Sequence, residues 1–417
     1  MIPASQAPMH PLPRRAPQPG LRRLRELAVG AVLAGALAIL AGCSGISGVQ
    51  DVFNKNPPPG TPAPPVQSSE IGTGAVRVAL ILPLSAGGNA GTVALSMKNA
   101  GEMALSEFNS PNIQLLVKDD GGTSGGAQQA AQQALAEGAE IIIGPLFAHS
   151  VGVVGAVARQ RGVPVIAFST DATVATRGVY LLSFLPEADV DRIVDYAMAS
   201  GKRSFVAMLS EGAYGNVVEG EFKQVVARKG GRIVGLERYA LTPAGIAGPS
   251  KVIAQASRGA DAVFIPEGPE VVPSVVQALT AANLDTKRVQ LLGTGLWDDP
   301  RIFNDVRLHG GWYAAPDGAG FRNFSARYRQ RYNQDPVRTA TLSYDAVALV
   351  AALVKTQGPQ RFSEQVLTSA SGFTGIDGLF RFRTDGTNER GLAVMKVSPT
   401  GGQIISPPPR AFGASAI

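Results

Sequence analysis

Cysteine and histidine are almost absent from this sequence. Of its 417 residues only Cys43 is a cysteine, and only three are histidines. Beyond Cys43 the chain can therefore form no disulfide, no thiol nucleophile and no cysteine-based metal site. The histidines lack the close spacing of zinc ligands, and no Gly-rich loop ending in Gly-Lys-Ser or Gly-Lys-Thr is present to hold phosphates. We therefore expect no metal and no cofactor.

A strong excess of charge is also missing once the first segment is set aside. Residues 1–42 contain five Arg and one Glu, a balance of +4; of the chain's 38 basic and 32 acidic residues this leaves 33 against 31, a balance of +2. A nearly neutral chain does not have the basic surface of a nucleic-acid-binding protein. The length is too great for one small core and suits two domains.

The first 42 residues have the order of features of a secretory signal. Five arginines precede Leu27–Leu40, an uncharged apolar run that is too short for a comfortable membrane span. The tetrapeptide that ends in Cys43 resembles the lipobox of bacterial lipoproteins, in which this cysteine carries the lipid. We expect a signal peptide over 1–42 and lipid attachment at Cys43; a plain secretory signal and an uncleaved anchor are the alternatives. Ser44, where an Asp would favour the inner membrane, favours the outer membrane.

Residues 43–75 are predicted to be a linker. Six of the nine residues from Pro57 to Pro65 are prolines, and such a composition favours extended polyproline II structure. We expect this spacer to hold the following domain away from the membrane, on the periplasmic side of the cell envelope.

Residues 140–171 have the pattern of a strand-helix-strand unit. Ile141–Ile143 and Val163–Phe168 suit strands buried on both faces of a parallel sheet, and Ser150–Gln160 has apolar residues at helical spacing. Ligands of α/β folds bind beyond the carboxyl ends of such strands. Here those ends offer backbone N–H groups and hydroxyls but no strong nucleophile, which indicates either a small-ligand site or ordinary turns and caps.

The alternation of strands and helices continues over the rest of the chain. It is predicted before this unit, from Val76, and again from Phe205 to Leu292. Near the end, Leu379–Arg383 and Leu392–Val397 are predicted to form a hairpin, and residues 401–417 a disordered tail. The fold class is therefore α/β, with two units, each a parallel sheet flanked by helices.

Several motifs, taken in order and spacing, resemble the leucine-binding-protein branch of the type I periplasmic binding proteins. They are V-A-L-I-L-P-L-S at 78–85, D-D-G-G-T-S-G-G at 119–126, I-I-I-G-P at 141–145, G-V-P-V-I-A-F-S-T at 162–170, A-Y-G at 213–215, G-T-G-L-W-D-D at 293–299 and L-S-Y-D-A-V at 342–347. The resemblance implies one domain over 76–400 with a ligand cleft between two lobes. The first lobe would contain about 76–185 and 340–400, and the second about 190–335. Three crossings between the lobes would lie near Leu185–Asp189, Pro300–Gly311 and Arg338–Ser343.

Two roles fit this resemblance. One is a periplasmic substrate-binding protein that delivers an amino acid of branched-chain type to an ABC transporter, with the ABC permease as partner. The other is the lipoprotein activator of penicillin-binding proteins, which regulates peptidoglycan synthesis by protein contact; its enteric form has a helical domain where this chain has only a linker. We favour the activator-like role, because a lipid anchor and a long spacer suit reaching a fixed partner. The amino-acid receptor is the alternative.

The resemblance also indicates which residues line the cleft. In amino-acid binders of this family, loops after the third and fourth strands grip the ligand's carboxylate and ammonium groups. Ser169 and Thr170 would hold a carboxylate here, while Tyr214 and Glu267 match the tyrosine and the acid of the second lobe. Phe147 stands where a small hydroxyl residue is usual, which alters the grip. The residues predicted to line the cleft are Ser85, Pro145, Leu146, Phe147, Ser169, Thr170, Asp171, Tyr214, Glu267, Trp297 and Asp298.

A hydrolase is the third hypothesis. Gly122–Gly126 matches the G-x-S-x-G pattern, with Ser124 as nucleophile. Asp298 or Asp299, and then His309, follow in the order of a triad. The two glycines after Ser124 make a loose loop rather than a strained elbow. We therefore expect no catalytic residue.

Overall fold

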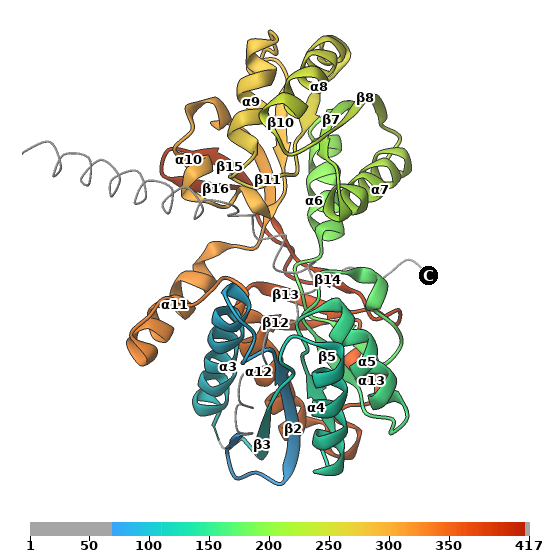
Figure 1. Cartoon of the computed structure of the whole chain (residues 1–417). Coiled ribbons are helices and arrows are strands. Elements are labelled where there is room, and N and C mark those ends of the chain that lie inside the picture. The colour runs from blue at the N-terminus through green and yellow to red at the C-terminus, as the bar shows by residue number, and fades with distance from the viewer. Residues whose placement is uncertain (1–68, 110, 413–417) are drawn as a thin grey trace, which may run out of the picture. The chain divides into compact units, whose positions relative to one another are not determined.

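The computed structural model describes residues 69–109 and 111–412 (Figure 1). The predicted signal peptide, the lipid-attachment residue Cys43 and most of the predicted linker lie outside these residues. Within the described part, no helix is long and apolar enough to cross a membrane.

The first lobe is built on a six-stranded sheet in the order β1-β3-β2-β4-β5-β6. All neighbouring strands run parallel except β1, which pairs antiparallel with β3. Leu80 and Ile142, in central strands, are wholly buried, as expected where helices cover both faces of a parallel sheet. The strands are β1 (Ser69–Ile71), β2 (Val76–Leu82), β3 (Ile113–Asp119), β4 (Ile141–Ile143), β5 (Val165–Ala167) and β6 (Val179–Leu181). The helices packed on them are α3 (Asn89–Glu107), α4 (Ser124–Ala136), α5 (Ala148–Arg159) and α12 (Ala340–Thr356), with the short η1 (Ala172–Val174), η5 (Gly358–Gln360) and α13 (Glu364–Leu367).

The second lobe has a seven-stranded sheet in the order β16-β15-β11-β10-β9-β7-β8. Its five parallel strands are β7 (Ser204–Ser210), β8 (Arg232–Tyr239), β9 (Ala262–Phe264), β10 (Gln290–Gly293) and β11 (Trp312–Ala315). Strand β15 (Ala393–Ser398) pairs antiparallel with β11, and β16 (Gly401–Ser406) pairs antiparallel with β15. The helices are α6 (Pro186–Ala199), α7 (Ala213–Arg228), α8 (Pro243–Ala256), α9 (Val272–Ala281) and α10 (Pro300–Phe303), with η2 (Ser257–Gly259), η3 (Gly295–Trp297) and η4 (Val306–Leu308). The predicted fold class, two parallel sheets flanked by helices, is confirmed.

The predicted closing hairpin is wrong. β13 (Gly378–Phe382) pairs not with Leu392–Val397 but with β14 (Asn388–Arg390), and with β12 (Phe373–Gly375) completes a three-stranded sheet. A tight turn explains this, because Arg383 N donates to Thr387 O at 2.8 Å and closes the chain before residue 392. β15 instead joins the second sheet, so the first lobe ends near residue 390 and not at 400.

Two of the three predicted crossings also need correction. The first lies between β6 and α6 and agrees with the prediction near Leu185–Asp189. The second follows Ala315, at the end of β11, because helix α11 (Gly318–Tyr332) packs on the first lobe beside α3 (Figure 1). Its aromatic face, with Phe324 and Tyr328, is buried against α3 and α12, so this helix does not belong to the second lobe. The third crossing joins β14 to β15.

The predicted ends of the domain are corrected as well. Ser69–Ile71, assigned to the linker, forms edge strand β1 and bonds to β3. Residues 401–406, assigned to a disordered tail, form β16, which pairs with β15. In both cases an edge strand of the sheet provides hydrogen-bond partners that the local sequence does not reveal.

Candidate functional site

The turn after β5 is built from polar groups that bond to their own backbone. Ser169 Oγ accepts a hydrogen bond from Asp171 N at 3.1 Å, and Asp171 Oδ1 accepts one from Thr173 N at 2.9 Å, which caps η1. Ser169 is buried, Thr170 is partly exposed and Asp171 is exposed. Thr170 is therefore the residue of this turn best placed to meet a ligand, while Asp171 serves mainly as a helix cap.

The loop after β4 differs from its prediction. Pro145 and Leu146 are buried, and Phe147, only 8% exposed, belongs to the same apolar core as Leu146. The Phe147 ring stacks on that of His149 with centroids 5.6 Å apart, and His149 Nε2 lies 3.1 Å from Gly122 O. Apolar packing thus draws these side chains inward, and the prediction that they line the cleft is corrected. What the loop presents is backbone.

Helix α5 begins at this edge without a side-chain cap. Its N-cap residue is Phe147, whose side chain has no acceptor to offer the first-turn N–H groups. Such an uncapped N-terminus carries a partial positive charge and attracts carboxylates. Ser85, after β2, is partly exposed and its N–H donates to Asp119 Oδ1 at 3.1 Å. The first-lobe edge therefore combines the hydroxyl-bearing residues Ser85 and Thr170, both partly exposed, with a helix N-terminus.

Asp120, at the end of β3, is fully buried in this edge. Its Oδ1 accepts a hydrogen bond from Gly122 N at 2.8 Å, and its Oδ2 has no hydrogen-bond partner within the described residues. Burial raises the pKa of Asp120 from its ordinary 3.8 to about 7. Asp120 is not among the residues predicted to line the cleft, because adjacent acids after a strand are usually caps or solvated turns.

The second-lobe edge gathers Tyr214 and Glu267, as predicted. Tyr214, at the start of α7, donates from its hydroxyl to Pro266 O at 2.9 Å, and this hydroxyl lies 3.2 Å from Thr294 Oγ1. Glu267, 1% exposed, accepts hydrogen bonds from Ser210 Oγ and, at 3.3 Å, from Ser210 N. These groups come from the carboxyl ends of β7, β9 and β10, where an α/β fold binds ligands.

Among the residues that the structure describes, no cation lies close enough to the Glu267 carboxyl group to affect its pKa. Burial raises its pKa, and hydrogen bonds from Ser210 offset this only in part. Burial also raises the pKa of Tyr214 well above its ordinary value, and the charges of Glu267 and Asp189 raise it further. A positively charged group placed here would relieve the cost of the buried carboxylate.

Two acids of the first crossing complete the edge and were missed from the sequence. Asp189 Oδ2 accepts a hydrogen bond from Gly295 N at 2.9 Å, and burial raises the Asp189 pKa from 3.8 to about 7. Burial also raises the pKa of Glu187, and the charges of Glu221 and of Asp171, in the first lobe, raise it further. The signal was present, because both acids follow Pro186 in the predicted crossing, but acids in the first turn of a helix are ordinary.

Trp297 and Asp298 are placed elsewhere. Trp297 is fully buried in the second-lobe core and donates from Nε1 to Ile265 O at 3.1 Å. Asp298 accepts a hydrogen bond from Tyr313 OH at 2.9 Å and lines a different cavity, together with Asp317 and Arg322. The prediction that these two residues line the cleft is therefore corrected.

The groups that a hydrolase would need are separated. Ser124 begins α4 in the first lobe, where Thr123 caps the helix, while His309 lies in the second lobe and its Nε2 is 2.8 Å from Phe303 O. Within the described residues, no group of three or more His, Cys, Asp or Glu is arranged to hold a metal ion.

A family model described as periplasmic binding protein matches residues 75–403. This chain belongs to the periplasmic binding protein family. The resemblance drawn from the sequence motifs is thereby confirmed, and membership of the family implies a periplasmic location.

Solved periplasmic binding proteins share the fold. A periplasmic ligand-binding protein of a branched-chain amino acid ABC transporter from Burkholderia xenovorans aligns with a TM-score of 0.64 and 16% identity, over 81% of this chain and 97% of its own. An ABC transporter substrate-binding protein from Desulfitobacterium hafniense in complex with Leu gives 0.59 and 17%, over 79% and 99%. A solute-binding protein of an ABC transporter from R. palustris in complex with benzoate gives 0.56 and 19%, over 82% and 99%. At these identities the likeness concerns the fold.

A curated relative also matches part of the chain. It is an uncharacterized protein of Rickettsia prowazekii, 20% identical over 181 residues, which are 41% of this chain. The alignment spans about half, 48%, of that relative.

Proposed function

We propose that this protein is a non-catalytic solute receptor, which binds a small amino-acid-like solute between its lobes and delivers it to an ABC permease. The observation that carries the proposal is the buried Glu267 carboxyl group. It lies at the carboxyl ends of the second-lobe strands, next to Tyr214, with no cation to neutralise it among the described residues. A ligand ammonium group supplies the missing partner.

The first lobe supplies the complementary charge. The N-terminus of α5 has no side-chain cap, and Ser169 and Thr170 lie in the neighbouring turn. Backbone N–H groups and hydroxyls at a helix N-terminus suit a carboxylate. A zwitterion would thus meet a positive end on one lobe and a carboxylate on the other. Such a ligand would favour the arrangement in which both lobes contact it.

The solved relatives support a ligand that contains a carboxylate. Leucine and benzoate, the compounds bound in two of them, both have this group. Benzoate has no ammonium group, however. The acids Glu187, Asp189 and Glu267, whose pKa values are all raised by burial, favour an amino acid over a plain carboxylic acid for this chain.

The comparisons favour this receptor over the activator-like role that the sequence first suggested, and no contact of the described residues supports the activator. We propose in addition that Cys43 is lipidated and tethers the receptor to the envelope. The mechanism would then be capture by a tethered receptor, followed by docking on a permease.

Binding to the full-length protein, purified in detergent, tests the receptor proposal. The common L-amino acids and benzoate would be screened by thermal shift, because a ligand at 100 times its Kd adds about 2.7 kcal/mol of stability. Loss of one partner of a buried charge pair costs about 2 kcal/mol or more, so Glu267→Gln should weaken amino-acid binding about 30-fold. Glu211→Gln, at an exposed acid one residue after Ser210, is the matched control and should bind as the wild type does.

Two results would contradict the proposal. One is the absence of any shift with the whole panel. The other is equal affinity of the Glu267→Gln and Glu211→Gln variants for every amino acid that binds.

A further inference from the structure

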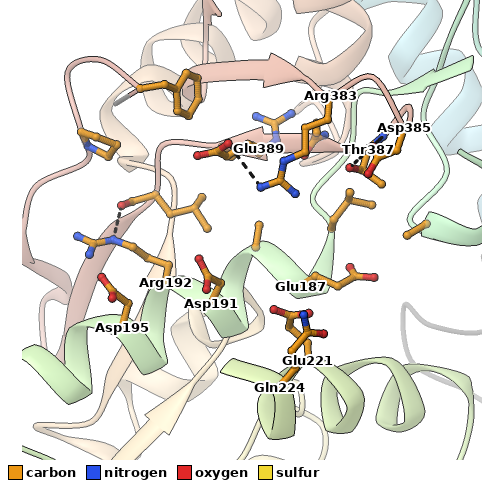
Figure 2. A pocket seen from close by; sticks show the side chains of 18 of the residues that line it. Glu187, Asp191, Arg192, Asp195, Glu221, Gln224, Arg383, Asp385, Thr387 and Glu389 are labelled. Carbon is orange, nitrogen blue, oxygen red and sulfur yellow. Dashed lines mark hydrogen bonds and ion pairs between the residues drawn. The ribbon is translucent and has the colours of Figure 1, made fainter. Parts of the chain in front are cut away.

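A cavity lies beside the crossings of the chain, next to Glu187 at the start of α6. Its volume is about 590 Å³, which is within the range of small-molecule sites. Its lining residues come from helices α6 and α7 and from the turn and strand β14 of the hairpin (Figure 2), with further residues from 407–412. We call this cavity the hinge pocket. None of the eleven residues predicted to line the cleft is among those that line it.

Arg390 is a buried cation in this pocket with most of its donors unused. The residue is 7% exposed, and its Nε donates to Ser183 O at 2.8 Å. Its Nη1 and Nη2 are buried and have no hydrogen-bond partner within residues 69–109 and 111–412. The guanidinium lies over the ring of Phe184, 4.5 Å from the ring centroid, which holds its plane in place. A fixed guanidinium with free Nη groups is suited to receive a carboxylate in the bidentate manner.

The acids near Arg390 do not fill this role. Asp377 binds Arg338 through both oxygens, at 2.6 and 3.0 Å, and also accepts a hydrogen bond from Thr341 Oγ1. Asp345 Oδ1 accepts one from Ile376 N at 2.8 Å, while its Oδ2 has no hydrogen-bond partner within the described residues and so does not bind Arg390 either. Burial lowers the pKa of Arg390, although the charges of Asp377, Asp345 and Asp189 act against this. The buried Arg390 guanidinium is therefore attracted by these carboxylates over a distance, but its Nη groups form no hydrogen bond with them.

The wall opposite is acidic. Figure 2 shows Glu187 on α6 and Glu221 on α7 near one another. Glu187 Oε2 is buried without a hydrogen-bond partner among the described residues, and burial raises the pKa values of both acids. Arg228 is committed to an ion pair with Asp191, and Arg383 lies 3.4 Å from Glu389. A phosphate or other dianion would meet this acidic wall as well as Arg390, so the charges disfavour it.

We propose that the hinge pocket is a second ligand site, which binds a small zwitterion with its carboxylate on Arg390 and its ammonium group on Glu187 and Glu221. Arg390 belongs to the hairpin next to the third crossing, whereas the two acids lie on second-lobe helices. An occupant therefore bridges the lobes where the chain crosses between them. Its binding would be coupled to the relative placement of the lobes, because only one placement offers both partners at the right separation. The site uses none of the eleven residues predicted to line the cleft, although it shares Glu187 with the second-lobe edge. Its carboxylate partner, Arg390, takes no part in the receptor proposal.

Calorimetric titration and thermal shift of the full-length protein test the site, with three probes of one carbon skeleton. L-Leucine has both charged groups, 4-methylpentanoate only the carboxylate, and 3-methylbutylamine only the ammonium group. In the Glu267→Gln background, which weakens the cleft, we expect leucine to bind the hinge pocket at least tenfold more tightly than either single-charge probe. Arg390→Met should abolish this binding, and Arg390→Lys should weaken it at least tenfold.

The ligand-free proteins separate a binding role from a structural one. Arg390→Met removes a buried cation without contacts on its Nη groups, so its melting temperature should equal or exceed that of the parent. Arg383→Met, at an exposed arginine in the same pocket, should leave leucine binding unchanged. Leucine binding that survives Arg390→Met, absence of leucine binding in the Glu267→Gln background, or a large fall in ligand-free melting temperature for Arg390→Met would overturn the proposal. Equal binding of leucine and 4-methylpentanoate would overturn the role of the two acids.

Discussion

The carboxylate of Asp189 accepts a hydrogen bond from the backbone N–H of Gly295 at 2.9 Å, across 106 positions of sequence. This bond ties the first turn of α6, just after the first crossing, to the end of β10. It fixes an acid at the place where the chain enters the second lobe. Asp189 also lies close enough to Arg390 and Glu187, two residues that line the hinge pocket, for their charges to affect its pKa.

Stability should depend on pH through three aspartates, of which Asp120 and Asp345 are buried and Asp189 is partly exposed. Burial raises the pKa values of Asp120, Asp189 and Asp345 from 3.8 to about 7 in the folded protein. The folded state then binds more protons than the unfolded state between about pH 4 and pH 7, so the free energy of unfolding should fall as pH rises through this window. Denaturant unfolding at pH 5, 6 and 7 measures this slope.

Asparagine variants assign that slope to single residues. Asp189→Asn keeps an oxygen for Gly295 N and removes the ionisation, so the slope between pH 5 and 7 should become shallower by up to about 1.4 kcal/mol per pH unit. Asp335→Asn, at an exposed acid, should leave the slope as it is. An unchanged slope in all three Asp→Asn variants would contradict the assignment.

The parallel strands could be predicted from the sequence alone. Ile141–Ile143 was predicted as a buried strand and is β4, because three successive β-branched residues bounded by Gly144-Pro145 suit few other structures. The partner of a strand is harder to predict. Leu392–Val397 has the same alternation whether it pairs within the first lobe or the second, and only the tight turn at Arg383–Thr387 decides.

The candidate site, too, could be predicted from the sequence only in part. Motif resemblance located Tyr214 and Glu267, which the structure brings to one strand edge. It also suggested Trp297, whose indole N–H is taken up by Ile265 O inside the core. Arg390 had no local signal at all, because an arginine in a short polar strand is ordinary unless its burial is known.

Removing the buried partner of Arg338 should destabilise the protein strongly. Arg338 binds both oxygens of Asp377, whose side chain is fully buried, and its guanidinium lies 4.7 and 4.6 Å from the ring centroids of Phe184 and Phe321. Asp377→Ala leaves a positive charge without its partner, and we expect a loss of about 3–5 kcal/mol in urea unfolding. The exposed pair Arg329–Asp335 is the control, and Asp335→Ala should cost at most about 0.5 kcal/mol. Similar losses in the two variants would contradict this expectation.

Two glycines of α11 test its docking on the first lobe. A methyl group at Gly320 would clash with the carbonyl oxygen of Ile376, which is backbone and cannot swing away, whereas at Gly318 it would meet only the mobile end of Arg322. Gly320→Ala should therefore lower the free energy of unfolding by about 2 kcal/mol, while Gly318→Ala should be neutral or slightly stabilising, since alanine favours helix. If both substitutions were tolerated equally, α11 would not be seated against Ile376.

The lipid anchor can be tested independently of any ligand. Cys43 ends a sequence that resembles a lipobox, and it is the only cysteine of the chain. We expect the wild-type protein to sediment with membranes and to enter the detergent phase in Triton X-114, and Cys43→Ser to lose both properties because no thiol remains to accept the lipid. Ser44→Ala, next to the cysteine, keeps the thiol and should remain with the membranes. Retention of Cys43→Ser in the detergent phase would show that an uncleaved apolar segment, and not a lipid, holds the protein to the membrane.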